Sequence, residues 1–144
     1  GEFATVHFRR VFMNPGKPLN FATAGDRLVF GLPGNPVSSL VSFHMFVVPA
    51  LGVMQGAPAC KHPVTPVTVE QTIQPSDRIE YQRARVVAGP DGRLVARTTG
   101  SQQSARLMSF VGANAFLVVP PGTEQIPAGS VLDAILFAPP HAAD

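Results

Sequence analysis

A rigid corner that leads into an apolar helix is the feature that most constrains how this chain can fold. Residues 31–43 read GLPGNPVSSLVSF, so two prolines and two glycines fall within six positions before an apolar run begins. The preceding residues 27–32 (RLVFGL) predict a short strand, and their continuous apolarity is typical of a strand buried on both faces of a parallel sheet. The order strand, tight loop, helix therefore favours an α/β layer.

The residues of this corner suit the start of a helix and also the binding of an anion. Asn35 is a candidate N-cap, and Pro36 then falls at the first helical position, where its missing N–H costs nothing. Gly34 permits a positive φ or a close approach of the backbone, and the Ser38 hydroxyl falls near the positive end of the helix dipole. Backbone N–H groups at a helix N-terminus bind oxyanions, although a capped helix start needs no ligand.

A second loop is predicted to face the same space. Residues 5–13 (TVHFRRVFM) predict a strand, and the turn NPGKPLN follows at residues 14–20. If this strand and residues 27–32 are parallel neighbours, both loops open at one edge of the sheet, where α/β proteins bind ligands. Lys17, held between a glycine and a proline, would then point toward Ser38, whereas on its own it reads as an ordinary solvated turn lysine.

The helix after the corner is predicted to run for about 15–18 residues, to Gly56, by its apolar pattern. It is apolar on nearly every face, which is typical of a buried helix, and Pro49 should kink it or mark its last turn. Two strands and one helix need covering layers, so we expect the chain to be the C-terminal portion of something larger.

The second half of the chain has a different character, and we place a boundary near residues 57–63. Five strand-like runs separated by turn signals predict a small antiparallel sheet or barrel, at residues 63–73, 78–88, 92–99, 114–120 and 130–138. Residues 101–110 predict a short helical turn. The fold class is therefore α/β followed by all-β, with an α/β part at residues 1–60 and a β-barrel at residues 61–144.

Composition excludes several classes of protein. Charged residues make up 14% of the chain against roughly 25% in typical soluble domains, which predicts a surface covered by a partner or by other chain. No apolar run reaches the ~18 residues that span a bilayer, so we expect no membrane insertion. The single cysteine, Cys60, excludes an internal disulfide, and the four histidines form no metal-ligand spacing.

The two loops together resemble a known family. PGKPL at residues 15–19 and FGLPGNPVSSLVSFHMFVVPAL at residues 30–51 resemble the molybdopterin molybdenumtransferases, the molybdenum insertases. The later residues 98–110 (TTGSQQSARLMSF) carry the T-G-x-Q-x-S pattern of that family's C-terminal domain. The resemblance implies the end of a doubly wound α/β molybdopterin-binding domain followed by a small β-barrel domain.

The resemblance also implies an activity. Family members insert molybdate into adenylylated molybdopterin, release AMP and form active molybdenum cofactor with the help of Mg²⁺. They work as cytoplasmic homodimers on small-molecule substrates, without nucleic acid or membrane. The Mg²⁺ ligands are expected outside this chain, so no metal site is assigned within it and residues 1–144 alone are not expected to catalyse the reaction.

Residue by residue, the resemblance implies that molybdate binds to the two loops and to two residues of the β domain. Lys17 and Ser38 are the implied catalytic residues, with Pro18 beside them in the anion site. Arg83 and Ser109 are the implied anion-binding partners in the β domain. The residues implied to shape the pterin loops are Gly16, Gly34, Asn35 and Pro36.

Other interpretations of these residues stay open from the sequence alone. Arg83 alternates with Tyr81 and Arg85, as an exposed strand arginine would, and Ser109 is an ordinary helix-end serine. The two polar residues of the T-G-x-Q-x-S pattern, Gln102 and Ser104, could equally cap the short helix.

One position departs from the family. Plant and animal members commonly carry a lysine three positions before the lysine of PGKP, where this chain has Asn14. A missing cation should weaken the attraction of a dianion by on the order of 1 kcal/mol.

Two alternative functions remain. One is a gephyrin-like scaffold that binds a peptide without catalysis. The other is a β-barrel that binds nucleic acid through scattered arginines, which is disfavoured because only Tyr81 accompanies them for stacking.

Overall fold

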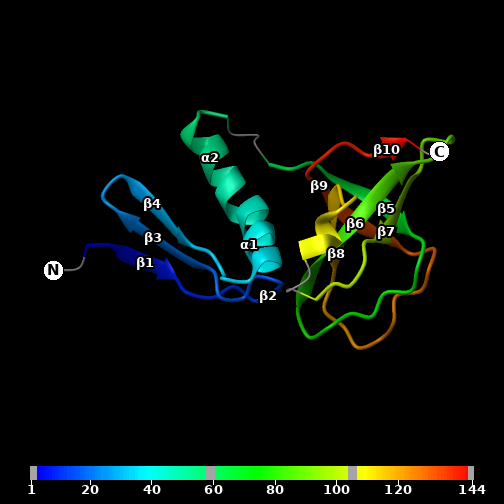
Figure 1. Ribbon diagram of the computed structural model, residues 1–144, viewed down its shortest axis with the longest axis horizontal. Coiled ribbons are helices and arrows are strands. Elements are labelled where there is room, and N and C mark those ends of the chain that lie inside the picture. Colours follow the sequence, from blue (N-terminus) through cyan, green and yellow to red (C-terminus); the bar gives the residue numbers. More distant parts are fainter. Residues whose placement is uncertain (1–2, 58–60, 104–106, 143–144) are drawn as a thin grey trace. The chain divides into compact units, whose positions relative to one another are not determined.

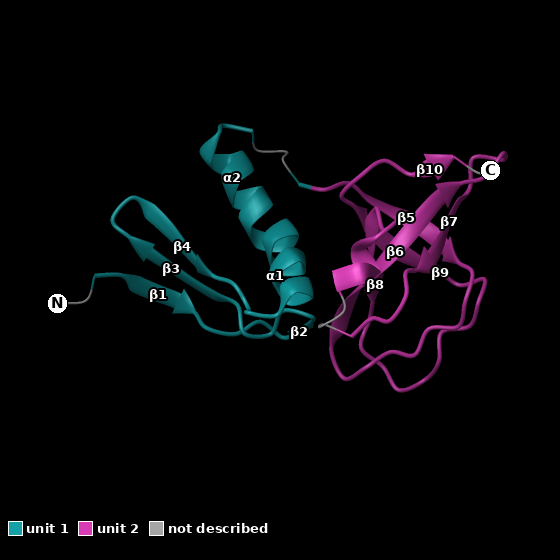
Figure 2. Ribbon diagram, viewed as in Figure 1, with its two compact units in different colours: residues 1–61 teal, residues 62–144 magenta. Residues whose placement is uncertain are grey.

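The computed structural model describes residues 3–57, 61–103 and 107–142. The chain divides into two compact units, residues 1–61 and 62–144 (Figure 2). Each unit is described by itself.

The sheet of the first unit is antiparallel throughout. Its strands are β1 (Thr5–Phe8), β3 (Asn20–Ala24) and β4 (Arg27–Gly31), in the order β1-β3-β4 (Figure 1). A two-residue loop that includes Gly25, at φ 57°, joins β3 to β4 as a hairpin. The prediction of parallel neighbours is therefore wrong, because β3 was missed and the strand before it was read too long.

The long strand predicted over residues 5–13 is two short pieces, β1 and β2 (Met13–Asn14). The strand predicted over residues 27–32 is confirmed as β4, but its burial on both faces is wrong. Leu28 and Val29 are 38% and 46% exposed. Leu28 and Val29 point to opposite faces of β4, and the described residues cover neither face at these two positions.

The predicted helix is present and has three parts. These are α1 (Pro36–Ser42), a π-helical segment (Phe43–Val47) and α2 (Val48–Met54). The N–H of Val48 bonds to the carbonyl of Phe43, five residues back, just before Pro49. A π-turn here lets the helix continue past a proline, which has no N–H to donate. The irregularity predicted from Pro49 is thus located in the turn that precedes it.

The helix buries one face rather than all of them. Val37, Ser38, Val41 and Ser42 are buried at helical spacing, whereas the apolar side chains near the C-terminal end, including Leu51, Val53 and Met54, are exposed. The helix contacts the sheet of its own unit at Phe46, whose ring lies 6.4 Å from that of Phe8. The prediction of a helix buried all round is therefore wrong.

By length and composition alone, this 19-residue helix could cross a membrane. The expectation of no membrane insertion rested on the absence of an unbroken apolar run of ~18 residues. One such helix is weak support for a membrane span, because the core helix of a soluble protein passes the same test.

The second unit is a closed five-stranded barrel. Its strands are β5 (Val64–Val69), β6 (Ile79–Ala88), β7 (Leu94–Thr98), β8 (Ala115–Val119) and β9 (Val131–Leu136). The ladder runs β6-β7-β5-β9-β8 and closes through pairing of β8 with β6. All pairs are antiparallel except β5 with β7. The five predicted strands and the predicted barrel are confirmed.

Small apolar side chains fill the barrel, among them Val67, Ala84, Val86, Leu117 and Ala134. Two elements lie outside it. The 3₁₀ turn η2 (Leu107–Phe110) matches the predicted helical turn, and β10 (His141–Ala142), which was not predicted, pairs in parallel with the end of β6.

Candidate anion site

The PGKP loop of the first unit is a tight, anchored turn with a lysine at its surface. The N–H of Leu19 bonds to the carbonyl of Gly16 at 3.2 Å, and the N–H of Val11 bonds to the carbonyl of Lys17 at 2.9 Å. Leu19 is fully buried and anchors the turn, whereas Lys17 and Pro18 are exposed. The fold thus fixes the backbone of Lys17 and leaves its side chain accessible.

Gly16 brings this loop into direct contact with helix α1. Its φ is +116°, and a Cβ built on it would lie 2.8 Å from the Oγ of Ser42 and 2.2 Å from the Cε of Met13. Ser42 is one helical turn from Ser38, so both serines lie on the face that packs against the loop. The two motifs singled out in the sequence therefore meet in one unit, through Gly16 and the serine face of the helix.

The hydroxyl of Ser42 is fully buried and has no hydrogen-bond partner in the described part of the chain. A buried hydroxyl without a partner costs about 1–3 kcal/mol. No pattern in the sequence indicates a role for Ser42, because a serine within an apolar helix is common.

The corner before the helix is rigid for backbone reasons. Asn35 holds the N-cap position with extended φ and ψ, but its side chain makes no capping bond; its carbonyl accepts the N–H of Ser39 at 2.9 Å. Pro36 begins the helix as predicted, and the Ser39 hydroxyl donates to the carbonyl of Pro33. Gly34 does not have a positive φ, and a Cβ there would meet open space. Ser38, at the third helical position, is 6% exposed.

In the barrel, Arg83 and Ser109 contact each other as expected from the resemblance. Arg83 lies on β6 and is 1% exposed, and its Nε donates to the Oγ of Ser109 at 2.9 Å. A second guanidinium nitrogen, Nη2, donates to the carbonyl of Ser101 at 3.3 Å. The alternative interpretation of Arg83 as an exposed strand arginine is therefore wrong, since η2 and the preceding loop cover it.

Arg83 is a buried cation with no carboxylate in ion-pair contact among the residues that the structure describes. Burial lowers the pKa of Arg83 to about 10, and the carboxylate of Glu80 partly opposes that shift. The guanidinium is still charged at neutral pH. A buried arginine whose hydrogen bonds go only to neutral groups keeps a positive charge that can bind an anion.

Gln102 holds the strand that carries Arg83, a role that the sequence did not indicate. Its amide oxygen accepts the backbone N–H of Arg83 at 2.9 Å, and its nitrogen donates to the carbonyls of Arg83 and Thr99. Thr99 also donates its hydroxyl to the carbonyl of Ser109. Gln102 therefore does not cap the short helix. Ser104 and Cys60 lie outside the described residues.

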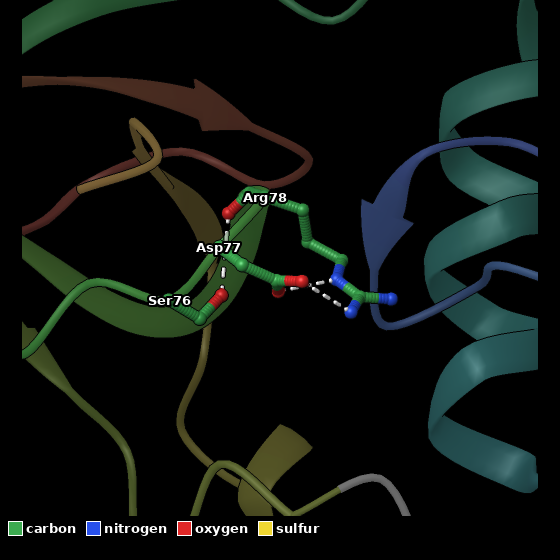
Figure 3. A network of polar contacts seen from close by, with 3 residues as sticks. All are labelled: Ser76, Asp77 and Arg78. Carbon is green, nitrogen blue, oxygen red and sulfur yellow. Dashed lines mark hydrogen bonds and ion pairs between the residues drawn. The ribbon is translucent and has the colours of Figure 1, made fainter. Parts of the chain in front are cut away.

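Arg78, which precedes Arg83 in the sequence, differs from it in having a carboxylate partner. Figure 3 shows Arg78 with both oxygens of Asp77, at 2.8 Å from Nε and from Nη2, while Ser76 donates to the carbonyl of Arg78. The hydrogen bonds to Asp77 raise the pKa of Arg78. The charge of Arg78 is thus neutralised by its neighbour in the sequence.

The candidate residues fall in two groups, one in each unit. Lys17, Pro18 and Ser38 belong to the first unit, and Arg83 and Ser109 to the second. Across residues 3–57, 61–103 and 107–142, no group of three His, Cys, Asp or Glu side chains is placed to hold a metal ion.

Comparison with known families matches both units. Residues 2–52 match the probable molybdopterin binding domain, and residues 67–137 match the MoeA C-terminal region, domain IV. The chain belongs to the MoeA family. The residues matched to the first domain include Lys17 and Ser38, and those matched to domain IV include Arg83 and Ser109. The helix that met the membrane criterion lies almost wholly within the first match.

Relatives from the MoeA family cover nearly all of this chain. It is 38% identical to gephyrin of Dictyostelium discoideum and 39% identical to the molybdenum cofactor synthesis protein cinnamon of Drosophila melanogaster, over 96% and 90% of its length. It is 30% identical to the molybdopterin molybdenumtransferase of Haemophilus influenzae over 88%. The chain spans only 23%, 22% and 32% of these proteins.

Solved structures of the MoeA family share the fold. A molybdopterin biosynthesis MoeA protein from Pyrococcus horikoshii superimposes with a TM-score of 0.74 at 25% identity, over 95% of this chain and 33% of that one. A molybdenum cofactor biosynthesis protein from Pyrococcus furiosus gives 0.71 at 27% identity, over 94% of this chain and 46% of that one.

Proposed function

We propose that this chain supplies the molybdate-binding residues of a molybdenum insertase. The observation that carries the proposal is the guanidinium of Arg83, which is buried, charged and hydrogen-bonded to a serine rather than to a carboxylate. Such a group is costly to bury without an anion. Molybdate is a dianion with acceptor oxygens only, so it requires cations and donors of this kind.

Each candidate residue has a role in this proposal. Lys17 offers a mobile ammonium at the surface of an anchored loop, and Ser38 offers a hydroxyl and N–H in the first helical turn. Arg83 and Ser109 supply a guanidinium and a hydroxyl from the barrel. Pro18 completes the loop beside the anion.

Four further residues shape the loops around the pterin. Gly16 keeps the PGKP loop close to the helix, and Asn35 with Pro36 fixes the direction in which the helix starts. The open space around Gly34 leaves room for a ligand to approach the backbone.

The complete protein would insert molybdate into adenylylated molybdopterin, release AMP and yield molybdenum cofactor. The support is that relatives carry the name molybdopterin molybdenumtransferase. We further propose Mg²⁺ as the helper ion, with ligands outside these residues, and a cytoplasmic homodimer. The exposed apolar side chains of α2 and β4 support a covering partner. No feature of the described residues specifically favours a gephyrin-like scaffold.

The experiment is a calorimetric titration of the 144-residue chain with molybdate. Saturable binding is expected, and Lys17→Ala and Ser38→Ala should each weaken it at least tenfold with little change in melting temperature. Lys61→Ala, which removes an exposed lysine outside the site, is the matched control. Absence of binding to the unmodified chain, or equal binding by Lys17→Ala, contradicts the proposal.

A further inference from the structure

The geometry points to a second oxyanion site on the outer face of the barrel, lined by none of the residues Lys17, Ser38, Arg83 and Ser109. We propose that it takes a small organic acid, with an anionic head on Arg85 and Arg97 and an apolar body on two valines. A pocket of about 310 Å³ lies there, on strands β6 and β7 and the end of β10. Its lining residues are Glu70, Arg85, Val87, Val95, Arg97, Thr98, Thr99 and Ala142.

Strand register places the two arginines directly opposite each other. Arg85 of β6 pairs with Arg97 of β7, and the next pair on the same face is Val87 with Val95. Side chains of directly opposed residues have Cβ atoms about 4.5–5.5 Å apart, and like charges in that position repel. The sheet therefore holds two guanidinium groups together beside an apolar floor.

The charges of this pair are only partly compensated. The Nε of Arg97 lies 3.2 Å from a carboxylate oxygen of Glu70. The guanidinium of Arg85 has neither an ion pair nor a hydrogen bond in the described part of the chain. The pocket thus contains two positive charges and one negative charge, and it would be relieved by an oxyanion that accepts from both arginines.

The other polar groups of the pocket are already engaged. The hydroxyl of Thr98 accepts from Gln71, and that of Thr99 donates to the carbonyl of Ser109. The arginines are therefore the groups left to bind a ligand. The pocket is near the lower end of the 300–1,000 Å³ range of ligand sites, so the ligand is small.

The test is a titration of the ¹⁵N-labelled chain, followed by the amide NMR signals of Val87, Val95 and Thr98. Three probes separate the parts of the ligand: inorganic phosphate, phenyl phosphate and benzoate. Saturable shifts are expected at millimolar concentrations. Phenyl phosphate should bind at least threefold more tightly than inorganic phosphate because its ring covers the valines. Comparison with benzoate shows whether a phosphate or a carboxylate head is preferred.

Two substitutions with opposite expected signs make the test sharp. Arg85→Gln should weaken phenyl phosphate binding at least fivefold, and Glu70→Gln should strengthen it about threefold because Arg97 is released. Arg93→Gln is the matched control, since Arg93 is an exposed arginine beside Asp91, outside this pocket. All these residues are exposed, so the variants should keep the fold.

The inference is overturned if these amides do not shift saturably, if Arg85→Gln binds like Arg93→Gln, or if Glu70→Gln weakens binding. None of these results affects the molybdate proposal, because none of its four residues lines this pocket.

Discussion

At the scale of single residues, one buried cation carries most of the functional argument. Arg83 sits where a strand side chain would ordinarily be solvated, and it is covered by a 3₁₀ turn and held by Ser109 and Ser101. Burying a charge whose hydrogen bonds go to neutral partners costs stability. Binding and stability should therefore respond differently when it is removed.

Arg83→Met should separate the effect of Arg83 on molybdate binding from its effect on stability. Methionine fills similar space without a charge to desolvate, so the unfolding free energy should stay within about 1 kcal/mol of the original value, as replacing buried ions by apolar side chains is often neutral. Molybdate binding should fall at least tenfold. Urea denaturation and calorimetric titration measure the two quantities, with Arg93→Met as the control. A variant that binds molybdate normally would show that Arg83 is structural.

Asn14 offers a gain-of-binding test. Asn14→Lys supplies the cation that the resemblance implies at this position, and one close charge of on the order of 1 kcal/mol corresponds to about fivefold tighter molybdate binding. The gain should shrink with added salt, because exposed charges are screened. Asn20→Lys, at another exposed asparagine, controls for net charge. Equal gains in both variants would speak against a specific position near the anion.

Gly16 tests the contact between the loop and the helix. Gly16→Ala places a methyl group on Met13 and Ser42 at a positive φ, so it should cost about 2 kcal/mol or more of stability. Gly25→Ala is the matched control, with φ +57° and open space around it, and should cost only about 1 kcal/mol. Thermal unfolding compares the stability of the two variants. Equal losses of stability would mean that Met13 and Ser42 move aside for the added methyl group.

At the scale of elements, side-chain amides complete the backbone pairing of β6. Asn114 accepts the N–H of Val86 at 2.7 Å and donates to the carbonyls of Val86 and Pro139 at 2.9 and 3.0 Å. Its own carbonyl accepts from Phe137 and Ala138. One buried asparagine thereby ties β6 to the segment that leads into β10.

Asn114→Ala should therefore be among the most damaging single changes in the barrel. It leaves the N–H and carbonyl of Val86 buried without these partners, at about 1–3 kcal/mol each. We expect a loss of about 3 kcal/mol in unfolding free energy by urea denaturation. Asn20→Ala, which removes an exposed amide that bonds to Pro18, should cost less than about 0.5 kcal/mol. Similarly small losses of unfolding free energy in both variants would refute the proposed role of Asn114 in holding β6 to the segment before β10.

The sequence predicted some elements well and others poorly, for physical reasons. The five barrel strands were found because β-branched runs alternate with Gly and Pro turns. Strand β3 (NFATA) was missed because alanine and asparagine have weak strand propensity, and β10 because two residues carry no pattern. Because β3 was not predicted, the strands on either side of it, β1 and β4, were wrongly expected to be neighbours.

The candidate site was predictable only as residue types at the right spacing. The resemblance implies that Arg83 and Ser109 are partners in anion binding; the structure shows a hydrogen bond between them, and their binding of an anion stays a prediction. The roles of Gln102 and Asn114 could not be predicted, because an amide that pairs with a distant backbone has no local signature. The same holds for Ser42, whose importance depends on the loop that covers it.

At the scale of the whole molecule, each of the two units offers its own set of donors for an oxyanion. The first unit offers an ammonium and a helix start, and the second offers a guanidinium with its serine. The chain represents about a quarter to a third of its relatives' length. We therefore expect binding of molybdate, rather than turnover, to be the property of these residues alone.

The central claim is tested most directly by locating tungstate, a heavier analogue of molybdate, in crystals of the chain by anomalous scattering. The account predicts that the dominant tungsten peaks contact Lys17 and Ser38 in the first unit, or Arg83 in the second. A dominant peak that touches none of these three, or no ordered tungstate at concentrations that saturate binding in solution, would contradict it.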